Sequence, residues 1–147
     1  MRPMPTLHTL LYRSHATREL TERELLPILM TSMRNNARVG LTGILLYGPP
    51  EPLPPPDPDA PPTDTVVPFE GPGVFVQWLE GPEDAIRNTY ERIDADHRHT
   101  DVEILDRGTS DRRLFPHWSM ALETVHELPE TPADIVRFAE QRHDQEV

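Results

Sequence analysis

The stretch Val74–Pro82, with the sequence VFVQWLEGP, decides how this chain folds. Its first seven residues are mostly β-branched, aromatic or aliphatic, which predicts a strand over Val74–Glu80. Gly81 ends that strand, and Pro82 suits the first turn of a helix because its φ is already helical. Two acidic residues follow, where a helix dipole favours negative charge. We therefore expect a buried strand that leads directly into a helix.

Outward from this stretch, apolar runs predict four more strands. The expected ranges are Leu7–Tyr12, Gly40–Tyr47, Asp101–Leu105 and Trp118–Leu122. With the helices between them, the order is β-α-β-β-α-β-β followed by a terminal helix. This order predicts an α+β protein with a ferredoxin-like sheet, two helices on one face, and a C-terminal helix.

The helices are indicated by their caps and apolar stripes. Thr21 and Glu24 form a capping-box pattern that predicts the start of the first helix. Pro27 inside that helix predicts an irregular start or a kink. The last helix opens at Pro132 and has an apolar face that could pack on the sheet or on another chain. That face consists of Ile135, Phe138 and Ala139.

Proline is concentrated between the second and third predicted strands. Residues 49–72 hold eleven of the 18 prolines in the chain. Proline prevents a helix or a central strand, and the segment has little apolar surface to offset its ordering entropy. We expect an extended, mostly disordered loop with polyproline II character, a tolerated insertion rather than a PxxP ligand.

The composition excludes several classes of protein. The chain has 147 residues and a net charge of −11, so it is a poor general binder of nucleic acid or anionic membranes. It has no cysteine, which excludes disulfides, thiolate nucleophiles and zinc-thiolate sites. No apolar run approaches the ~20 residues of a membrane span, and no signal-peptide pattern opens the chain. We expect a cytoplasmic protein without a metal site.

Gln77 is the polar exception in an otherwise apolar strand. Side chains alternate along a strand, so Gln77 shares a face with Phe75 and Leu79 and is expected to be buried. A buried amide needs hydrogen-bond partners. It either bonds a loop backbone or faces a ligand that offers both donors and acceptors. Tyr12 ends a predicted strand that neighbours this one in a split βαβ sheet, so its hydroxyl is a candidate partner.

Polar residues at the ends of the first two helices have two interpretations. Asn35 and Asn36 suit a helix end, but their amides also suit the polar edge of a heteroaromatic ring. Arg98 and His99 either complement a helix dipole or contact the phosphate or ribitol chain of a cofactor. The inward-facing positions of both helices are ordinary core residues, or they wall a slot for a flat ring. These positions are Ile28, Ser32 and Ile93.

Together these segments resemble the BLUF family, blue-light sensors that use FAD. The matching stretches are LLYRSHAT, SMRNNARVGLTGILLY, GVFVQWLEG, DADHRHTDVEIL and WSMAL, in the family's order from about Leu7 to Leu122. The resemblance implies a BLUF-like flavin-binding domain over residues 1–122, interrupted by the Pro-rich loop at 49–72. A C-terminal helical extension over residues 123–147 follows.

The resemblance also implies a role for individual residues. Tyr12 corresponds to the family's photoactive tyrosine, and Gln77 to the glutamine between that tyrosine and the flavin. Asn36 corresponds to the asparagine that holds the isoalloxazine edge, and Asn35 to a neighbouring contact. The ring would be sandwiched by Ile28 and Ile93, and the rest of the cofactor lined by Ser32, Asp96, Arg98 and His99. Trp118 and Met120 share a face of the last predicted strand and correspond to the pair that relays the signal.

The implied activity is a light switch, not enzymatic turnover. Tyr12 would donate an electron and a proton toward the excited flavin, and Gln77 would change its orientation or tautomer, which shifts the absorption to the red. The cofactor implied is FAD, with FMN left open. A flavin- or nucleotide-binding module without photochemistry is the alternative, and blue-light spectra distinguish the two. Only ~25 residues follow Leu122, too few for an effector domain, so a protein partner or a change in self-assembly would carry the signal.

Overall fold

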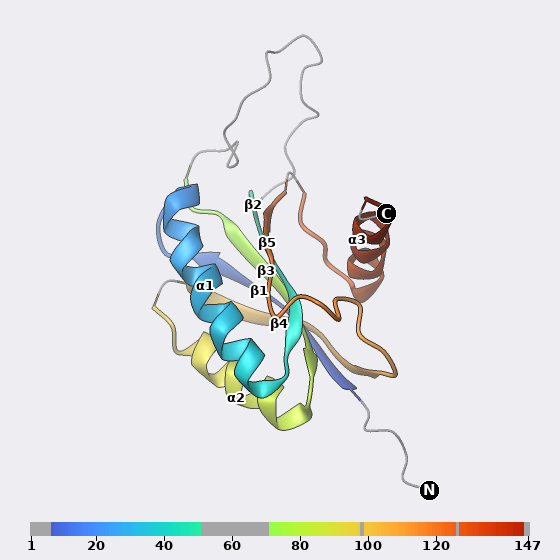
Figure 1. The fold of residues 1–147 in the computed structure, drawn as a ribbon. Helices are drawn as coiled ribbons and strands as arrows, with labels where there is room; N and C mark the ends of the chain where they lie inside the picture. Colours follow the sequence, from blue (N-terminus) through green and yellow to red (C-terminus); the bar gives the residue numbers. More distant parts are fainter. Residues whose placement is uncertain (1–6, 51–70, 98, 126, 146–147) are drawn as a thin grey trace, which may run out of the picture.

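The computed structural model describes residues 7–50, 71–97, 99–125 and 127–145. Strands β1 to β5 form one mixed sheet in the order β4-β1-β3-β2-β5. Helices α1 (Glu22–Val39) and α2 (Glu83–Asp94) cover one face of the sheet, and α3 (Pro132–Gln145) packs on the other face (Figure 1). The expected ferredoxin-like α+β fold with a C-terminal helix is therefore confirmed. The strands are β1 Leu7–Ala16, β2 Thr42–Gly48, β3 Val74–Gly81, β4 His99–Ser110 and β5 Leu122–Thr124.

β3 lies at the centre of the sheet, and all its residues are buried. It pairs in antiparallel fashion with β1 on one side and β2 on the other. The alternation expected from the sequence is present. Phe75 and Leu79 belong to the core under α1 and α2, whereas Val76 and Trp78 belong to the core on the opposite face. A strand that is apolar on both faces is stable only when both faces are covered. This explains why α1 and α2 cover one face of the sheet and α3 covers the other.

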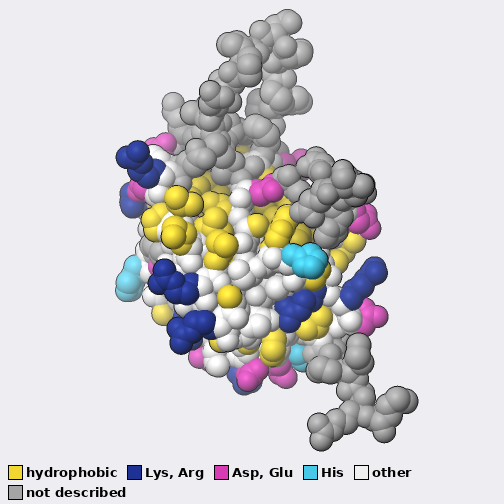
Figure 2. Space-filling model, in the orientation of Figure 1, with side chains coloured by type: hydrophobic (Ala, Val, Ile, Leu, Met, Phe, Trp, Pro, Cys, Tyr) yellow, Lys and Arg dark blue, Asp and Glu magenta, His cyan; other side chains and the backbone are white. Residues whose placement is uncertain are grey.

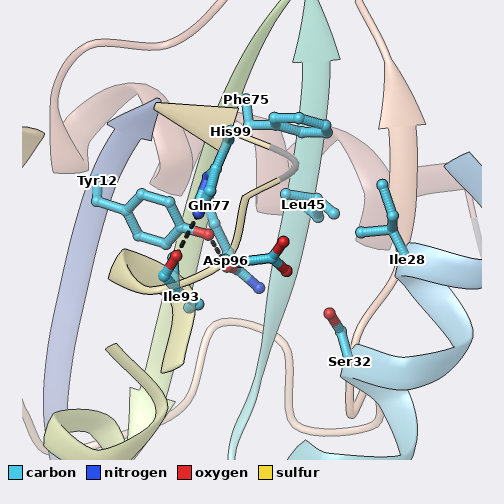
Figure 3. A pocket seen from close by; sticks show the side chains of 9 residues that line it. All are labelled: Tyr12, Ile28, Ser32, Leu45, Phe75, Gln77, Ile93, Asp96 and His99. Atoms are coloured by element: carbon cyan, nitrogen blue, oxygen red, sulfur yellow. Dashed lines mark hydrogen bonds between the residues drawn. The ribbon is translucent and has the colours of Figure 1, made fainter. Parts of the chain in front are cut away.

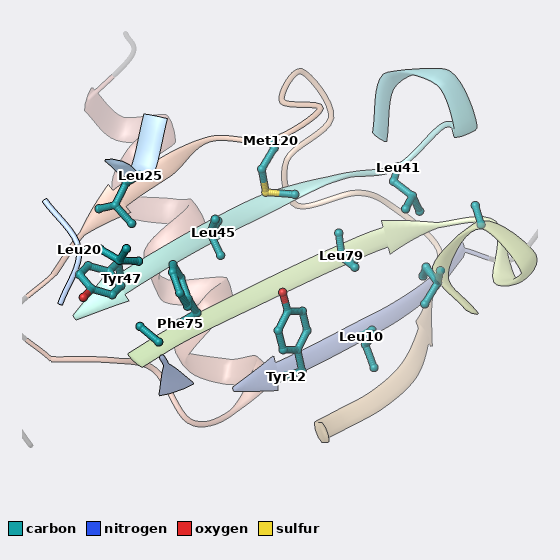
Figure 4. Packing of buried hydrophobic residues seen from close by; sticks show 13 residues of the cluster. Leu10, Tyr12, Leu20, Leu25, Leu41, Leu45, Tyr47, Phe75, Leu79 and Met120 are labelled. Atoms are coloured by element: carbon teal, nitrogen blue, oxygen red, sulfur yellow. The ribbon is translucent and has the colours of Figure 1, made fainter. Parts of the chain in front are cut away.

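Two apolar clusters fill the space on either side of the sheet. Figure 4 shows the cluster on the α1 and α2 face, where Tyr12, Leu45 and Met120 pack together with neighbouring leucines. On the other face, Ile135 and Ala139 of α3 pack among strand residues such as Ile44. The apolar face of the last helix, which the sequence left open, thus docks on its own sheet.

α1 begins and ends with strong caps. The Thr21 hydroxyl accepts from the Glu24 amide at 3.3 Å, and the Glu24 carboxylate accepts from the Thr21 amide at 3.3 Å. The start is therefore regular, and Pro27 lies inside a continuous helix. Gly40 closes the helix in the left-handed region at φ 78°, where glycine carries no steric penalty.

The outer side of α1 leaves apolar side chains in solvent. Leu26 and Met30 are each 53% exposed, and Met33 is also exposed. Figure 2 shows hydrophobic side chains gathered on the surface over α1, with arginine or lysine side chains close to them. Among the described residues no helix is long and apolar enough to cross a membrane.

The last two strands differ from the expected ranges. β4 runs from His99 to Ser110, well beyond Asp101–Leu105, because it pairs with nearly the whole length of β1. The strand expected over Trp118–Leu122 is wrong: β5 begins only at Leu122. Two backbone bonds tie residues 118–121 to β2, but Met120 packs under α1 and α2, whereas Trp118 and Ala121 pack in the opposite cluster.

The long insertion lies between antiparallel neighbours β2 and β3. Residues 51–70 fall outside the described part of the chain. The disorder expected for residues 49–72 therefore stays a prediction.

Candidate functional site

A cavity of about 60 Å³ lies between the sheet and helices α1 and α2 (Figure 3). Most of its lining was predicted from the sequence, and Leu45 and Phe75 are the additions. The lining residues are Tyr12, Ile28, Ser32, Leu45, Phe75, Gln77, Ile93, Asp96 and His99.

A chain of hydrogen bonds crosses the floor of the cavity. The Tyr12 hydroxyl donates to Oε1 of Gln77, as the sequence suggested. The other end of the amide, Nε2, donates to the Met120 sulfur at 3.4 Å. Tyr12 and Gln77 are opposite partners in the β1–β3 register, and each is only 3% exposed. A thioether is a weak acceptor, so the amide nitrogen retains capacity to donate toward the cavity.

The environment of Tyr12 keeps its phenol neutral. Burial raises the pKa of Tyr12, and the nearby Asp96 carboxylate and the Tyr90 phenol raise it further. The Tyr90 ring meets the Tyr12 ring edge-on, with centroids 6.4 Å apart. Tyr12 is therefore a proton donor over the whole ordinary pH range.

His99 joins the end of α2 to the sheet at the rim of the cavity. Its Nε2 bonds the Ile93 carbonyl, and its Nδ1 lies 2.7 Å from the Ser14 hydroxyl. A carbonyl can only accept, so Nε2 carries a proton and donates to Ile93. The ring also meets Phe75 edge-on at 6.4 Å. His99 is held in one orientation on the cavity wall.

The other predicted site residues lie outside this lining. Asn36 is 1% exposed and donates to the Ser119 carbonyl at 2.9 Å. Asn35 is half-buried beside it, and Arg98 lies outside the described residues. The sequence placed both asparagines at a ring edge. The structure shows Asn36 tying α1 to the segment that carries Met120, and the contact of both asparagines with a ring edge stays a prediction.

Trp118 and Met120 do not share a face, contrary to expectation. Met120 belongs to the cluster under α1 and α2, whereas Trp118 packs with the opposite cluster. Trp118 stacks on Phe115, with ring centroids 5.5 Å apart and planes at 19°. The expectation failed because alternation was applied to residues that are not in a strand.

Three residues of the site were missed, and two of them left a signal. Phe75 alternates in phase with Gln77, which already placed it on the cavity face. Ser14 lies two residues beyond Tyr12, in phase with it along β1. Leu45 opposes Gln77 in the β2–β3 register, and that relationship requires knowledge of the pairing.

The residues of the cavity fit a flat ring with a polar edge. Ile28, Ile93 and Leu45 offer apolar walls from α1, α2 and the sheet. Gln77 presents an amide whose nitrogen donates to the Met120 sulfur, and the second hydrogen of that nitrogen can donate to a ring carbonyl. These features match an isoalloxazine ring, which is apolar on both faces and bears carbonyls on one edge.

Comparison with known proteins agrees with this geometry. Residues 7–51 and 66–121 match the family described as BLUF, sensors of blue-light using FAD. The chain is 35% identical over 128 residues to the photoactivated adenylate cyclase subunit beta of Euglena gracilis, covering 86% of this chain and 12% of that protein. The dark-state structure of the BLUF protein BlrB aligns with a TM-score of 0.61 and 30% identity, over 90% of this chain and 83% of that chain.

A second similar solved structure contains a flavin. It is Klebsiella pneumoniae BlrP1 with FMN and cyclic diGMP, which aligns with a TM-score of 0.62 and 27% identity. The alignment covers 90% of this chain and 30% of that chain. The chain thus spans a small part of this protein and of the Euglena cyclase subunit.

Proposed function

Because this chain belongs to the BLUF family, whose members bind flavin, we propose that it is a blue-light photoreceptor with its flavin between α1 and α2. The observation that carries the proposal is the chain of bonds from Tyr12 through Gln77 to Met120. It joins a neutral phenol to an amide that can exchange one partner for another.

When bound, the flavin would supply a chromophore that accepts an electron and a proton after absorbing blue light. Tyr12 is the donor of both, since its buried phenol keeps its proton and already points at the amide. The electron and the proton return to Tyr12 as the charges recombine. The net chemistry is zero, so what persists is a change in hydrogen bonding.

Gln77 is the residue whose hydrogen bonds would change. In the present arrangement its Oε1 accepts from Tyr12 and its Nε2 donates to Met120. Rotation or tautomerisation of the amide gives the cofactor's carbonyl edge a different donor and removes the donor from the Met120 sulfur. The new hydrogen bond to the carbonyl edge would shift the absorption to the red. The loss of the donor to the Met120 sulfur would transmit the change to the segment before β5.

The remaining lining residues would bind and orient the cofactor. Ile28 and Ile93 face the cavity from opposite helices and would hold the two faces of the ring. Ser32, Asp96 and His99 would contact its polar parts. The cofactor contact expected for Arg98 stays a prediction. FAD is the cofactor named for the family, and FMN offers the same ring.

The domain would act as a sensor and not as an enzyme. Cyclase activity is named for the Euglena relative, of which this chain covers 12%, and we do not extend that activity to this chain. The signal would pass from Met120 to a protein partner or to a change in self-assembly.

Absorption spectra test the proposal directly. The purified, flavin-reconstituted protein is measured in darkness, under blue light and again after darkness. We expect a yellow protein whose visible band moves reversibly to the red. A flavin spectrum that blue light leaves unchanged would identify a binding module without photochemistry, and a colourless protein would reject the flavin site.

A further inference from the structure

Glu80 is a buried carboxylate on the face of β3 opposite the cavity. It is 1% exposed, and four donors surround it. Oε1 accepts from Trp78 Nε1 at 2.9 Å and from the Leu114 amide at 2.8 Å. Oε2 accepts from the Thr42 hydroxyl at 2.8 Å and from the Phe115 amide at 2.9 Å. These bonds use about four acceptor sites, the full capacity of an ionised carboxylate.

Arg113 closes the same cluster from the other side. One guanidinium nitrogen donates to the Thr42 hydroxyl at 2.8 Å and to the Glu80 carbonyl at 3.2 Å. The other donates to the Gly40 carbonyl, just past α1, at 2.8 Å. The segment that begins at Arg113 is therefore fastened to β2, β3 and the end of α1. Hydrogen bonds to ionised groups are about twice as strong as neutral ones, so this end is firmly held.

The opposite end of that segment meets the cavity. The Gly43 amide donates to the Trp118 carbonyl at 3.0 Å, and the Leu45 amide donates to the Ala121 carbonyl at 2.8 Å. Between these two ties, Ser119 and Met120 turn toward the helices. Ser119 accepts from Asn36, and Met120 accepts from Gln77 at 3.4 Å.

The segment over residues 113–121 thus has two unequal ends. One end is bonded to a buried charge, and the other touches the amide that is proposed to switch. If both ends were loose, a change at Gln77 would only alter the disorder of the segment. With one end fixed, the same change displaces residues 118–121 relative to the sheet.

We propose that Glu80 is a positioning residue of the light switch. Its carboxylate holds Leu114 and Phe115, so that Met120 is presented to Gln77 in darkness and residues 118–121 move as a unit in light. The inference rests on the proposed photoreceptor function. It assigns to Glu80 no contact with the cofactor, which lies on the other face of the sheet.

Glu80→Gln is the direct test, because it keeps the volume of the side chain. An amide offers one oxygen and places an NH2 group against two donors. If the NH2 group faces Leu114 and Trp78, both of these donors lose their acceptor. If it faces Thr42 and Phe115, the Phe115 amide loses its acceptor. Glu103→Gln is the matched control, since the Glu103 carboxylate bonds Arg13 at 2.8 Å on the exposed edge of the sheet.

Hydrogen–deuterium exchange over residues 113–121, in darkness and under blue light, provides the readout. In the wild-type protein we expect light to speed exchange at residues 118–121 by roughly two- to tenfold, the factor that corresponds to the loss of one hydrogen bond. The Leu114 and Phe115 amides should not change. In Glu80→Gln the one of these two amides that faces the new NH2 group should exchange fast already in darkness, and light should add less than about twofold at residues 118–121. The red shift should remain.

Two further variants keep the test decisive if Glu80→Gln does not fold. Thr42→Val removes one donor to the carboxylate and the acceptor of Arg113 at nearly constant shape, and it should reduce the light–dark difference. Thr42→Ser should restore it.

If Glu80 only stabilised the fold, its replacement would raise exchange equally in darkness and in light. The light–dark difference in exchange at residues 118–121 would then be unchanged. That result, in Glu80→Gln or Thr42→Val, overturns the proposal. A wild-type protein with a red shift but no light-dependent exchange at residues 118–121 also overturns it. A wild-type protein without a red shift overturns the proposed function instead.

Discussion

Tyr12 and Gln77 stand directly opposite each other on the antiparallel strands β1 and β3, and the tyrosine hydroxyl donates to the glutamine amide. Their bond depends on the register of the two strands. A slip of one residue would turn Tyr12 to the opposite face of the sheet, away from Gln77 and the cavity. The β1–β3 register is uninterrupted from His8 to His15, whereas β1 shifts against β4 next to Tyr12. The β1–β3 pairing is therefore regular at Tyr12 and Gln77, whose hydrogen bond the proposed switch requires.

Gln77→Leu should separate flavin binding from switching. Leucine keeps a similar volume and the apolar walls Ile28 and Ile93, so the reconstituted protein should stay yellow. It should show no lasting red shift, because no amide remains to change its bonding. Visible spectra before and after blue light measure this, and a normal reversible red shift would contradict the mechanism.

Tyr12→Phe should also abolish the red shift, for a different reason. The amide stays in place, but the donor of the electron and proton is gone. Without that quencher the flavin should fluoresce more strongly than in Gln77→Leu, which retains Tyr12. Fluorescence yield at matched flavin occupancy distinguishes the two variants, and equal yields would rule out Tyr12 as the donor.

Alkaline pH should destabilise the wild-type protein through Tyr12. Burial first, then Asp96 and Tyr90, raise the pKa of Tyr12 above its ordinary value of 10.0. Above that pH the unfolded chain has lost a proton that the folded protein keeps, so the free energy of unfolding falls as pH rises. The slope is at most ~1.4 kcal/mol per pH unit for one group.

Urea unfolding of the wild type and Tyr12→Phe between pH 8 and about 11.5 isolates this effect. Tyr47, whose pKa burial also raises, is present in both proteins and cancels in the comparison. The two curves should run parallel below about pH 10 and converge above it. Parallel curves over the whole range would show that Tyr12 does not titrate differently in the folded state.

Asn36→Ala should loosen the segment that carries Met120. The substitution removes the donor to the Ser119 carbonyl and costs about 1–3 kcal/mol if that carbonyl stays dry. We expect a lower unfolding free energy, weaker flavin retention and faster dark recovery. Asn35→Ala, at the half-buried neighbour, is the control; if both variants behave alike, the Ser119 bond has no special role.

Ile135→Ala should weaken the docking of α3 without affecting the cavity. Ile135 is fully buried against the far face of the sheet, and its truncation should cost about 2–5 kcal/mol. Val136→Ala, at an exposed neighbour, should change the unfolding free energy by no more than about 0.5 kcal/mol. Urea unfolding compares them, and a red shift of wild-type size in both would show that the docking of α3 does not affect the cavity.

Local rules were enough for much of this protein. The capping box at Thr21 depends on residues three apart, and it forms as predicted. The alternation in β3 depends on a period of two, and it placed Gln77 on the same face as Phe75. The predicted hydrogen bond between Tyr12 and Gln77 needed one additional fact, that the first and third strands are neighbours in a split βαβ sheet.

Tertiary pairing decided the rest, because those features depend on residues distant in the chain. β4 is more than twice as long as its apolar run suggests because β1 supplies bonding groups along its whole length. Glu80 is in phase with Val76 and Trp78, a sign of burial, but only the fold brings it the amides of Leu114 and Phe115. Residues 118–121 read as a strand from their composition. They form no strand: the Asn36 and Gln77 amides bond Ser119 and Met120 on the face under α1 and α2, whereas Trp118 and Ala121 pack on the opposite face.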